Sequence, residues 1–198
     1  MIRKPGIKID TRKYFYRIHL ATLLLGIVLT LLLVALKINF FNYKKPIAYQ
    51  NMSQISLKDF RGFNIPGRTL DGNDKFATIT TSIEVSRNQD AFAVTSLFHP
   101  SRSYIYNRNA VSSDLLKHEM YHFHITEIFA RELRKLLAEK GEQVDFKKKY
   151  DSILVEEKEM QKIYDYDSYH GYLLSKQKEW ESKIDSILLI LDDYKISK

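Results

Sequence analysis

The chain of 198 residues contains no cysteine. Disulfide bonds and thiolate metal ligands are therefore excluded, although the absence of cysteine does not decide the cellular compartment. No internal repeat and no low-complexity segment interrupts the sequence. The length is enough for one domain with a substantial hydrophobic core, since 44% of the residues are hydrophobic and 28% are charged.

A surface that would bind phosphate is also lacking. The net charge is +7, but residues 1–45 hold nine basic residues against one acidic residue, whereas the remainder holds 22 basic and 23 acidic residues. The excess positive charge therefore belongs to the N-terminus. The body has no electrostatic footprint for nucleic acid, and we expect no nucleic-acid partner.

One segment lacks charge altogether. Leu20–Leu36 is seventeen residues long. A helix of that length spans ~25 Å, and the apolar residues that follow extend it to the ~30 Å of a bilayer core. Six Lys or Arg precede the segment, so the positive-inside rule predicts a cytoplasmic basic tail at 1–19. We expect a single-pass anchor at 20–41, with the C-terminal domain extracytoplasmic, either periplasmic or on the cell surface.

Two other interpretations of this segment are open. A cleaved signal peptide normally has an apolar region of about 7–15 residues followed by small residues at the cut. Here the run is longer, and Val34-Ala35-Leu36-Lys37 is a poor cleavage site. A core helix of a soluble protein would need burial on every side, because the run has no polar face. An uncleaved membrane anchor fits the sequence best.

Beyond the anchor we expect a linker at 42–52 and an α+β domain at 53–198. β-Branched residues and turn signals predict short extended pieces, and apolar residues at helical spacing predict three helices. The predicted strands are Gln54–Phe60, 76–85, 91–98 and 103–106, with a turn at 71–74; the predicted helices are 113–140, 143–163 and 172–194, with a break at 164–171. A small antiparallel sheet should pack on the first of these helices, in a zincin-like arrangement.

The first predicted helix carries the pattern H-E-x-x-H from His118 to His122. Ser112 or Ser113 can cap its N-terminus. On a helix, two histidines four residues apart point the same way, so both imidazoles can hold one Zn²⁺ ion. Glu119 lies about 100° round the helix from His118, beside that face. There it can take a proton from a metal-bound water without being a ligand.

A catalytic zinc usually takes three protein ligands and keeps one position open. No neighbouring residue of the same helix can supply the third ligand. His124 and Glu127 lie about 240° and 180° round the helix from His118, and Glu132 lies about 21 Å along its axis. The third ligand must therefore come from another part of the chain.

His170 is the best candidate from its position. It falls in the predicted turn between two helices, and Gly171 follows it, which allows the backbone to approach closely. Asp165 and Asp167 lie in the same loop and could orient an imidazole. If His170 is not the ligand, these two carboxylates are the next candidates. The other interpretation of His170 is a surface histidine in a tyrosine-rich loop.

The sequence resembles the bacterial predicted secreted zinc-dependent proteases, known as domain of unknown function 922, over about residues 53–190. The matching residues are Leu57–Gly62, 76–80, Ser103–Ile105, Leu115–Phe123, Ile125, Glu127, Ala130, Arg131, Leu133, Tyr164, Asp165, Ser168, His170, Gly171, Gln177 and Trp180. The resemblance implies a zinc-dependent hydrolase, and it implies His170 as the third ligand because the family's distal His-Gly falls on it.

The sequence departs from that family at three places. Met120-Tyr121 stands where the family tends to have Gln-Gly, His124 stands where it tends to have Asp, and Tyr104 replaces Trp. These departures leave the predicted metal ligands untouched. They leave the substrate preference open, and no role of the missing Asp carries over.

Two functions are compatible with these patterns. The first is a membrane-anchored zinc metallopeptidase that acts on a peptide or protein, with Glu119 as general base and then as proton donor to the leaving amine. Tyr104, Tyr106, Tyr166 and His124 are candidates to stabilise the oxyanion. The second is a catalytically inert zinc-binding or helical interaction protein of the cell envelope. No cofactor besides zinc is expected.

Overall fold

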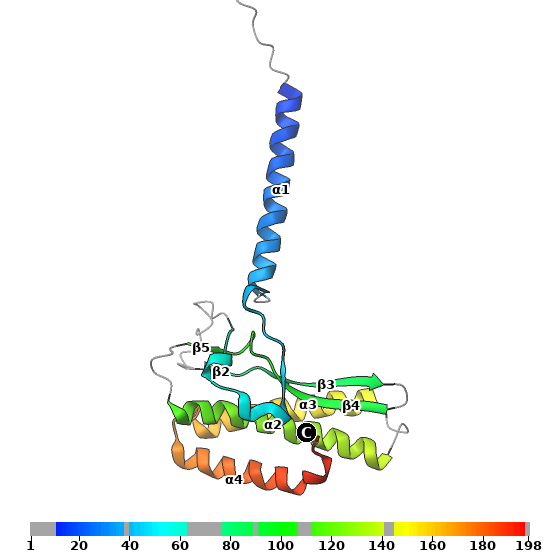
Figure 1. The fold of residues 1–198 in the computed structure, drawn as a ribbon, viewed down its shortest axis with the longest axis vertical. Coiled ribbons are helices and arrows are strands. Elements are labelled where there is room, and N and C mark those ends of the chain that lie inside the picture. The colour runs from blue at the N-terminus through cyan, green and yellow to red at the C-terminus, as the bar shows by residue number, and fades with distance from the viewer. Residues whose placement is uncertain are drawn as a thin grey trace, which may run out of the picture. The chain divides into compact units, whose positions relative to one another are not determined.

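The computed structural model describes residues 11–37, 40–62, 77–88, 91–106, 112–140 and 145–196. The chain forms two compact units, residues 1–41 and 42–198 (Figure 1). Some predicted features lie outside the described residues. They are the basic tail before residue 11, the turn at 71–74, the first residue of the strand predicted at 76–85, and the start of the helix predicted at 143.

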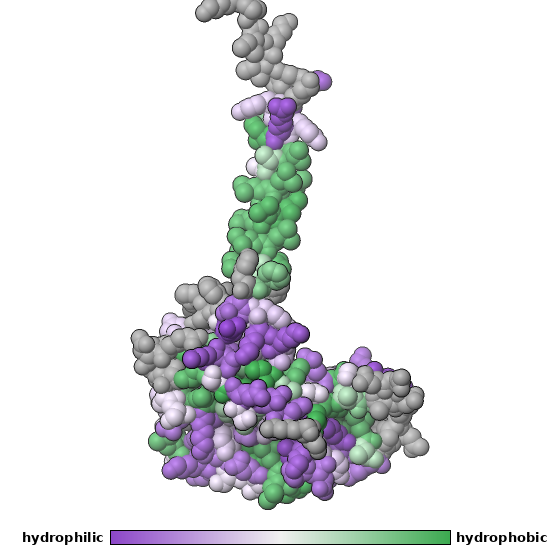
Figure 2. Space-filling view, in the orientation of Figure 1, coloured by the Kyte–Doolittle hydropathy of each residue, from purple (hydrophilic) through white to green (hydrophobic). Residues whose placement is uncertain are grey.

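The first unit contains one long helix, α1 (Thr11–Lys37). Within it, Tyr14–Leu36 is long and apolar enough to cross a membrane, with a mean hydropathy of 2.6 and no residue of the window buried. Figure 2 shows an apolar surface along most of the visible face of this helix. A core helix of a soluble protein would be mostly buried, whereas no residue of this window is buried within its own unit.

The second unit contains two small antiparallel sheets. Strands β1 (Ile47–Ala48), β4 (Ala91–Phe98) and β3 (Thr81–Asn88) pair in that order, and β2 (Ala77–Thr78) pairs with β5 (Tyr104–Ile105). The strand predicted at 76–85 is therefore divided in two. At the break the backbone bonds to side chains instead of to a ladder, since the Thr80 amide donates to Ser103 Oγ.

The region before the sheets differs from the prediction. Residues 42–52 are not a linker, because β1 pairs with β4 in the register Ile47–Phe98. The segment predicted as a strand at 54–60 is helical instead, with 3₁₀ turns η2 (Tyr49–Gln54) and η3 (Leu57–Asp59). A capping box between Ser56 and Asp59 starts η3, a local hydrogen-bond pattern that competes with strand formation.

Three helices follow the strands. Helix α2 (Ser113–Lys140) has the predicted bounds, and the Leu115 amide donates to Ser112 Oγ at 3.1 Å, so Ser112 is the cap. Helix α3 (Phe146–Ser168) continues through most of the break predicted at 164–171. Helix α4 (Leu174–Ile190) is followed by the 3₁₀ turn η5 (Asp192–Tyr194). A mixed fold of helices with small antiparallel sheets is thus confirmed.

Helix α2 is the centre of this unit and contacts β2, β3, β4, α3 and α4 (Figure 1). It packs into two hydrophobic clusters. Phe123 joins Phe60 and Phe98 on the side of the short strands, whereas Ile125 joins Trp180 and residues of α3 and α4 on the other. Burial on several sides holds the axis of α2 in place, and with it the side chains of the H-E-x-x-H pattern.

Candidate metal centre

Helix α2 presents three buried polar side chains from the H-E-x-x-H pattern. His118, Glu119 and His122 have relative exposures of 1%, 4% and 9%. The two imidazoles are four residues apart, and their Nε2 atoms lie 3.2 Å from each other. The helix geometry that the sequence predicted for this pair is therefore present, and both ring nitrogens face the same point.

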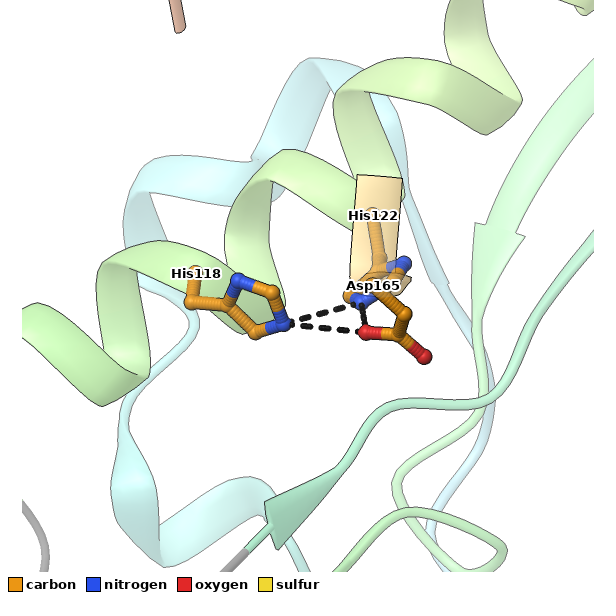
Figure 3. Close-up of side chains that lie close together, drawn as sticks. All are labelled: His118, His122 and Asp165. Carbon is orange, nitrogen blue, oxygen red and sulfur yellow. Dashed lines mark hydrogen bonds and ion pairs between the residues drawn. The ribbon is translucent and has the colours of Figure 1, made fainter. Parts of the chain in front are cut away.

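Asp165 completes the group. It projects from the last turn of α3, and its Oδ1 atom lies 3.2 Å from His118 Nε2 and 2.9 Å from His122 Nε2 (Figure 3). These three ligand atoms lie within 4.8 Å of one another and could hold a metal ion. Asp165 thus occupies the place for which the sequence favoured His170.

A glutamine of α4 determines which nitrogen of His118 carries hydrogen. Gln177 Nε2 donates to Tyr164 Oη at 2.7 Å and to Glu181 Oε1 at 3.1 Å, so its amide oxygen must face His118. His118 Nδ1 lies 2.9 Å from this Oε1 and must donate to it. In the neutral ring, Nε2 is then left with a bare lone pair.

A second glutamine, Gln161 of α3, determines in the same way which nitrogen of His122 carries hydrogen. Gln161 Nε2 donates to the His122 carbonyl at 3.0 Å and to Glu157 Oε1 at 3.2 Å. Its Oε1 therefore accepts from His122 Nδ1, 2.5 Å away. Both imidazoles direct an Nε2 lone pair toward the Asp165 carboxylate, and three acceptors within 3.2 Å of each other require a proton or a cation between them.

The protonation of these side chains follows from the same contacts. Burial raises the pKa of Asp165, but the imidazoles of His118, His122 and His170 around its carboxylate outweigh burial and hold this pKa well below its usual range. Burial lowers the pKa of His122, but the hydrogen bond and the negative charge of Asp165 together raise it by more, so the net shift is upward. A metal ion would displace this His122 proton, because a ligating imidazole must be neutral.

His170 lies at the edge of the group. Its Nδ1 atom is 3.2 Å from Asp165 Oδ1, and its side chain is 23% exposed. Tyr169, His170 and Gly171 all have positive φ, at 50°, 55° and 83°. Two consecutive non-glycine residues in this region cost roughly 1–2 kcal/mol each, and such strain is typical of functional sites. The turn brings His170 against Asp165, although His170 does not join the converging ligand atoms.

Gly171 allows this turn to touch the candidate metal ligand His118 directly; we call His118, His122 and Asp165 the metal group. A Cβ atom added to Gly171 would lie 3.0 Å from His118 Cγ and 3.2 Å from His118 Nδ1. The close backbone approach that the sequence suggested at this glycine is therefore real, and it is made against His118.

We expect Gly171→Ala to destabilise the body by about 1–3 kcal/mol, because it adds a strained φ and a clash with a buried ring. Displacement of His118 should also lower the metal affinity at least about tenfold, which is the lower end of the effect seen when the groups that orient a metal ligand are disturbed. Urea unfolding followed by the fluorescence of Trp180, the only tryptophan, and metal titration measure both effects. Gly26→Ala is the control, since its Cβ would meet nothing within 4 Å. Unchanged stability and affinity in Gly171→Ala would contradict this role.

The metal group opens into a cleft of about 400 Å³. The segment Ala77–Thr81 lines one side of it, Glu119 lines the helix side, and Leu154 and Lys158 of α3 contribute to the opposite wall. Glu119 Oε2 accepts a hydrogen bond from the Ile79 amide at 2.7 Å. The carboxylate is thus held in a fixed orientation beside the three ligand atoms without belonging to them.

The remaining predicted site residues lie elsewhere. The Asp167 carboxylate accepts a hydrogen bond from Trp180 Nε1 at 3.1 Å and so ties α3 to α4. Tyr104 pairs with Thr78 in the two-stranded sheet and does not line the cleft. Tyr106 and Tyr166 are 54% and 84% exposed. His124 Nδ1 is 2.5 Å from Tyr49 Oη, on the side of α2 away from the ligands, and burial lowers its pKa.

Sequence reasoning missed Gln161 as a functional residue and did not assign a role to Gln177. Both glutamines lie on mixed helix faces: Glu157 and Asp165 are one turn from Gln161, Glu181 is one turn after Gln177, and apolar residues lie on the same faces. Gln177 is seven residues before Ile184 and fourteen before Leu191, which are both buried, and Gln161 is seven residues after Leu154. A polar residue within a buried stripe was the signal available.

No protein-family model matches the chain, no curated protein is similar to it, and no solved structure resembles it. The resemblance to the secreted zinc-dependent proteases therefore stays a prediction.

Proposed function

We propose that this protein is a membrane-anchored zinc metallopeptidase, with His118, His122 and Asp165 as metal ligands and Glu119 as general base. The observation that carries the proposal is the convergence of two imidazole lone pairs and one carboxylate oxygen beside a second, separately held carboxylate, that of Glu119. Catalytic zinc in hydrolases uses a donor set of this kind, in which two His come from an H-E-x-x-H helix and one carboxylate comes from another element.

The spacing of the ligand atoms is compatible with zinc. Nitrogen and oxygen ligands at 2.0–2.2 Å from a tetrahedral ion lie about 3.3–3.6 Å from each other. The three distances here are 3.2, 3.2 and 2.9 Å. Little movement would bring them to that value. The hydrogen bonds from Nδ1 of each histidine to Gln161 and Gln177 are the supporting contacts that such ligands need.

A zinc ion at this position supplies Lewis acidity, which polarises a peptide carbonyl and lowers the pKa of water. The other steps belong to the protein. The Ile79 amide holds the Glu119 carboxylate toward the cleft, where it accepts a proton from water and later returns it to the leaving amine. The segment Ala77–Thr81 lies along the cleft, beside the path that an extended peptide would take.

The proposed topology follows from the N-terminal sequence. The basic residues before α1 favour a cytoplasmic N-terminus, and the catalytic unit would then act outside the membrane, in the periplasm or at the cell surface. Substrates would be peptides or proteins of that compartment.

The test uses the full-length chain in lipid nanodiscs, purified without chelators. We expect about one zinc per chain by elemental analysis, and cleavage of a broad peptide library. Glu119→Gln should keep its zinc and lose at least about 100-fold in kcat/KM, the usual contribution of a general base. Glu139→Gln is the matched control on the same helix, because Glu139 is 51% exposed at the side chain and far along α2. Zinc without Glu119-dependent cleavage would exclude the peptidase.

One observation favours the inert alternative. His170 Nδ1 is 3.2 Å from Asp165 Oδ1, so His170 is close enough to become a fourth ligand after a small rotation. Four protein ligands close a zinc site, as in structural sites, and leave no position for water. Spectroscopy of a cobalt-substituted protein separates the two functions. A coordination that changes on adding a peptide hydroxamate indicates an open position, and an unchanged one indicates a closed structural site.

A further inference from the structure

A second hollow adjoins the metal centre on the far side of His170. It has a volume of about 730 Å³, and its walls include Tyr166, Tyr169, Tyr172 and Leu173. We call these four residues the tyrosine basin. Their relative exposures are 84%, 64%, 55% and 48%, so most of their apolar surface faces solvent. Clustered exposed apolar groups of this kind commonly mark a binding site.

The basin is fixed to the metal centre by its backbone. It is formed where α3 ends and the left-handed turn begins, and the Leu173 amide donates to the Ser168 carbonyl at 2.9 Å. The rings of Tyr169 and Tyr172 pack on each other with centroids 6.1 Å apart. The same turn presses Gly171 against His118. The backbone of the turn that carries the basin is therefore packed directly against His118.

The basin and the cleft at the metal centre are neighbours that share two lining residues. Asp165 and His170 line both hollows and form the wall between them. A peptide that crosses the metal centre and continues past His170 must enter the basin with one of its next side chains. At ~3.3 Å per residue, one or two residues of an extended chain span ~3–7 Å, and His170, which lines both hollows, touches Asp165.

The charged groups at the basin are already engaged within the protein. Lys176 Nζ donates to Glu179 Oε2 at 2.7 Å, and Asp167 Oδ2 accepts from Trp180 Nε1. Recognition is therefore left to the aromatic rings and Leu173. Tyrosine rings give a large contact area with little loss of side-chain entropy, and they pack well on other aromatic or branched apolar side chains.

We propose that the tyrosine basin is a specificity subsite that binds an aromatic or leucine-like side chain of the peptide substrate, one or two residues from the scissile bond. This inference rests on the proposed peptidase function. It names the substrate class as peptides with a large apolar residue beside the cleavage site.

The test scans one Tyr through each position of an otherwise Ser/Gly/Ala octapeptide labelled with fluorescein, using full-length protein in nanodiscs. Hydrolysis is measured with the wild type, and binding is measured by anisotropy with the zinc-loaded Glu119→Gln variant. We expect Tyr at one position to raise both kcat/KM and affinity about tenfold over Ser, as aromatic contacts of this kind do. Tyr169→Ser/Tyr172→Ser should abolish that ratio, whereas Tyr43→Ser, a 61% exposed tyrosine outside both hollows, should keep it.

The zinc content of the double variant must equal that of the wild type, so that a lost preference is not a lost metal. The subsite is overturned if the double variant keeps the wild-type preference for the Tyr peptide over the Ser peptide. It is also overturned if the wild type shows no such preference. Cleavage that does not depend on Glu119 overturns the peptidase, while the anisotropy arm still decides the basin. Dimerisation seen by light scattering, and removed by the double variant, would instead assign the basin to a second copy of this chain.

Discussion

The Asp165→Ala variant is expected to bind zinc with an affinity at least about 100-fold lower than the wild type. Removing a group that only supports a metal ligand costs about 10–100-fold in affinity, and removing a ligand itself should cost more. The Asp165 carboxylate supplies the only negative charge among the three converging ligand atoms. Without it, two neutral imidazoles remain. Competition titration with a chromogenic chelator measures the affinity, and the thermal unfolding midpoint in added zinc should fall together with it, since bound metal stabilises the folded state.

Two variants make this result specific. Asp167→Ala removes a carboxylate two residues away that binds Trp180, and it should keep wild-type zinc affinity. His170→Ala removes the histidine that touches Asp165, and it should weaken zinc by about 10–100-fold, less than Asp165→Ala. A larger loss in His170→Ala than in Asp165→Ala would restore His170 as the third ligand and reduce Asp165 to its support.

Local signals predicted helix α2 and its H-E-x-x-H pattern well. Ser112 at the cap and the apolar spacing that follows gave the bounds of α2, and the i, i+4 relation of His118 and His122 gave the direction of their rings. Both features depend only on residues within a few turns of each other. The same was true of the strand at 91–98, where Phe92, Val94, Thr95 and Phe98 lie within eight residues of the sequence.

The position of Asp165 beside the two imidazoles was harder to predict, because the end of α3 does not look helical. Residues 164–168 contain tyrosine, aspartate and serine, which suggest a loop when read alone. In the structure, Tyr164 and Ser168 are one helical turn apart and both fully buried, and Ser168 Oγ donates to the Tyr164 carbonyl. Burial of Tyr164 between His118 and Trp180 extends the helix. Asp165 thereby points at the metal group from a helix, while the predicted loop shrinks to the turn that carries His170.

Residues 42–60 were misread for a related reason. Ile47 and Ala48 form a strand only because β4 offers its edge about fifty residues later in the sequence. Two residues carry no periodicity of their own. Partners distant in the sequence also decide the break at Ile79, whose amide bonds to Glu119 instead of to a strand. Such pairings depend on tertiary contacts that a local pattern does not contain.

Glu127→Gln is expected to destabilise the body by about 3–5 kcal/mol, the usual cost of removing one partner from a buried ion pair. Glu127 is 1% exposed and lies on the face of α2 opposite the metal ligands. Its carboxylate accepts from Arg131 Nε at 3.0 Å and from Arg134 Nη1 at 3.0 Å, as well as from Ser96 Oγ. Both guanidinium groups would keep their charge after the substitution and lose the buried Glu127 carboxylate, with only the half-exposed Asp192, 3.7 Å from Arg131 Nη1, remaining beside Arg131.

The two arginines explain why the loss should be global. Arg131 Nη1 donates to the Leu188 carbonyl at 2.8 Å, and Arg134 donates to the carbonyls of Val94 and Tyr194, so Glu127 orients groups that join α2 to β4 and to the C-terminal end of α4. Urea unfolding followed by Trp180 fluorescence measures the change. Glu139→Gln, which breaks only a 3.9 Å surface pair with Lys135, should cost no more than about 1 kcal/mol. Because Glu127 is remote from the ligands, zinc affinity at low urea should stay near the wild-type value. A Glu127→Gln protein that lost zinc while keeping its stability would place Glu127 in the metal site instead of in the frame that supports it.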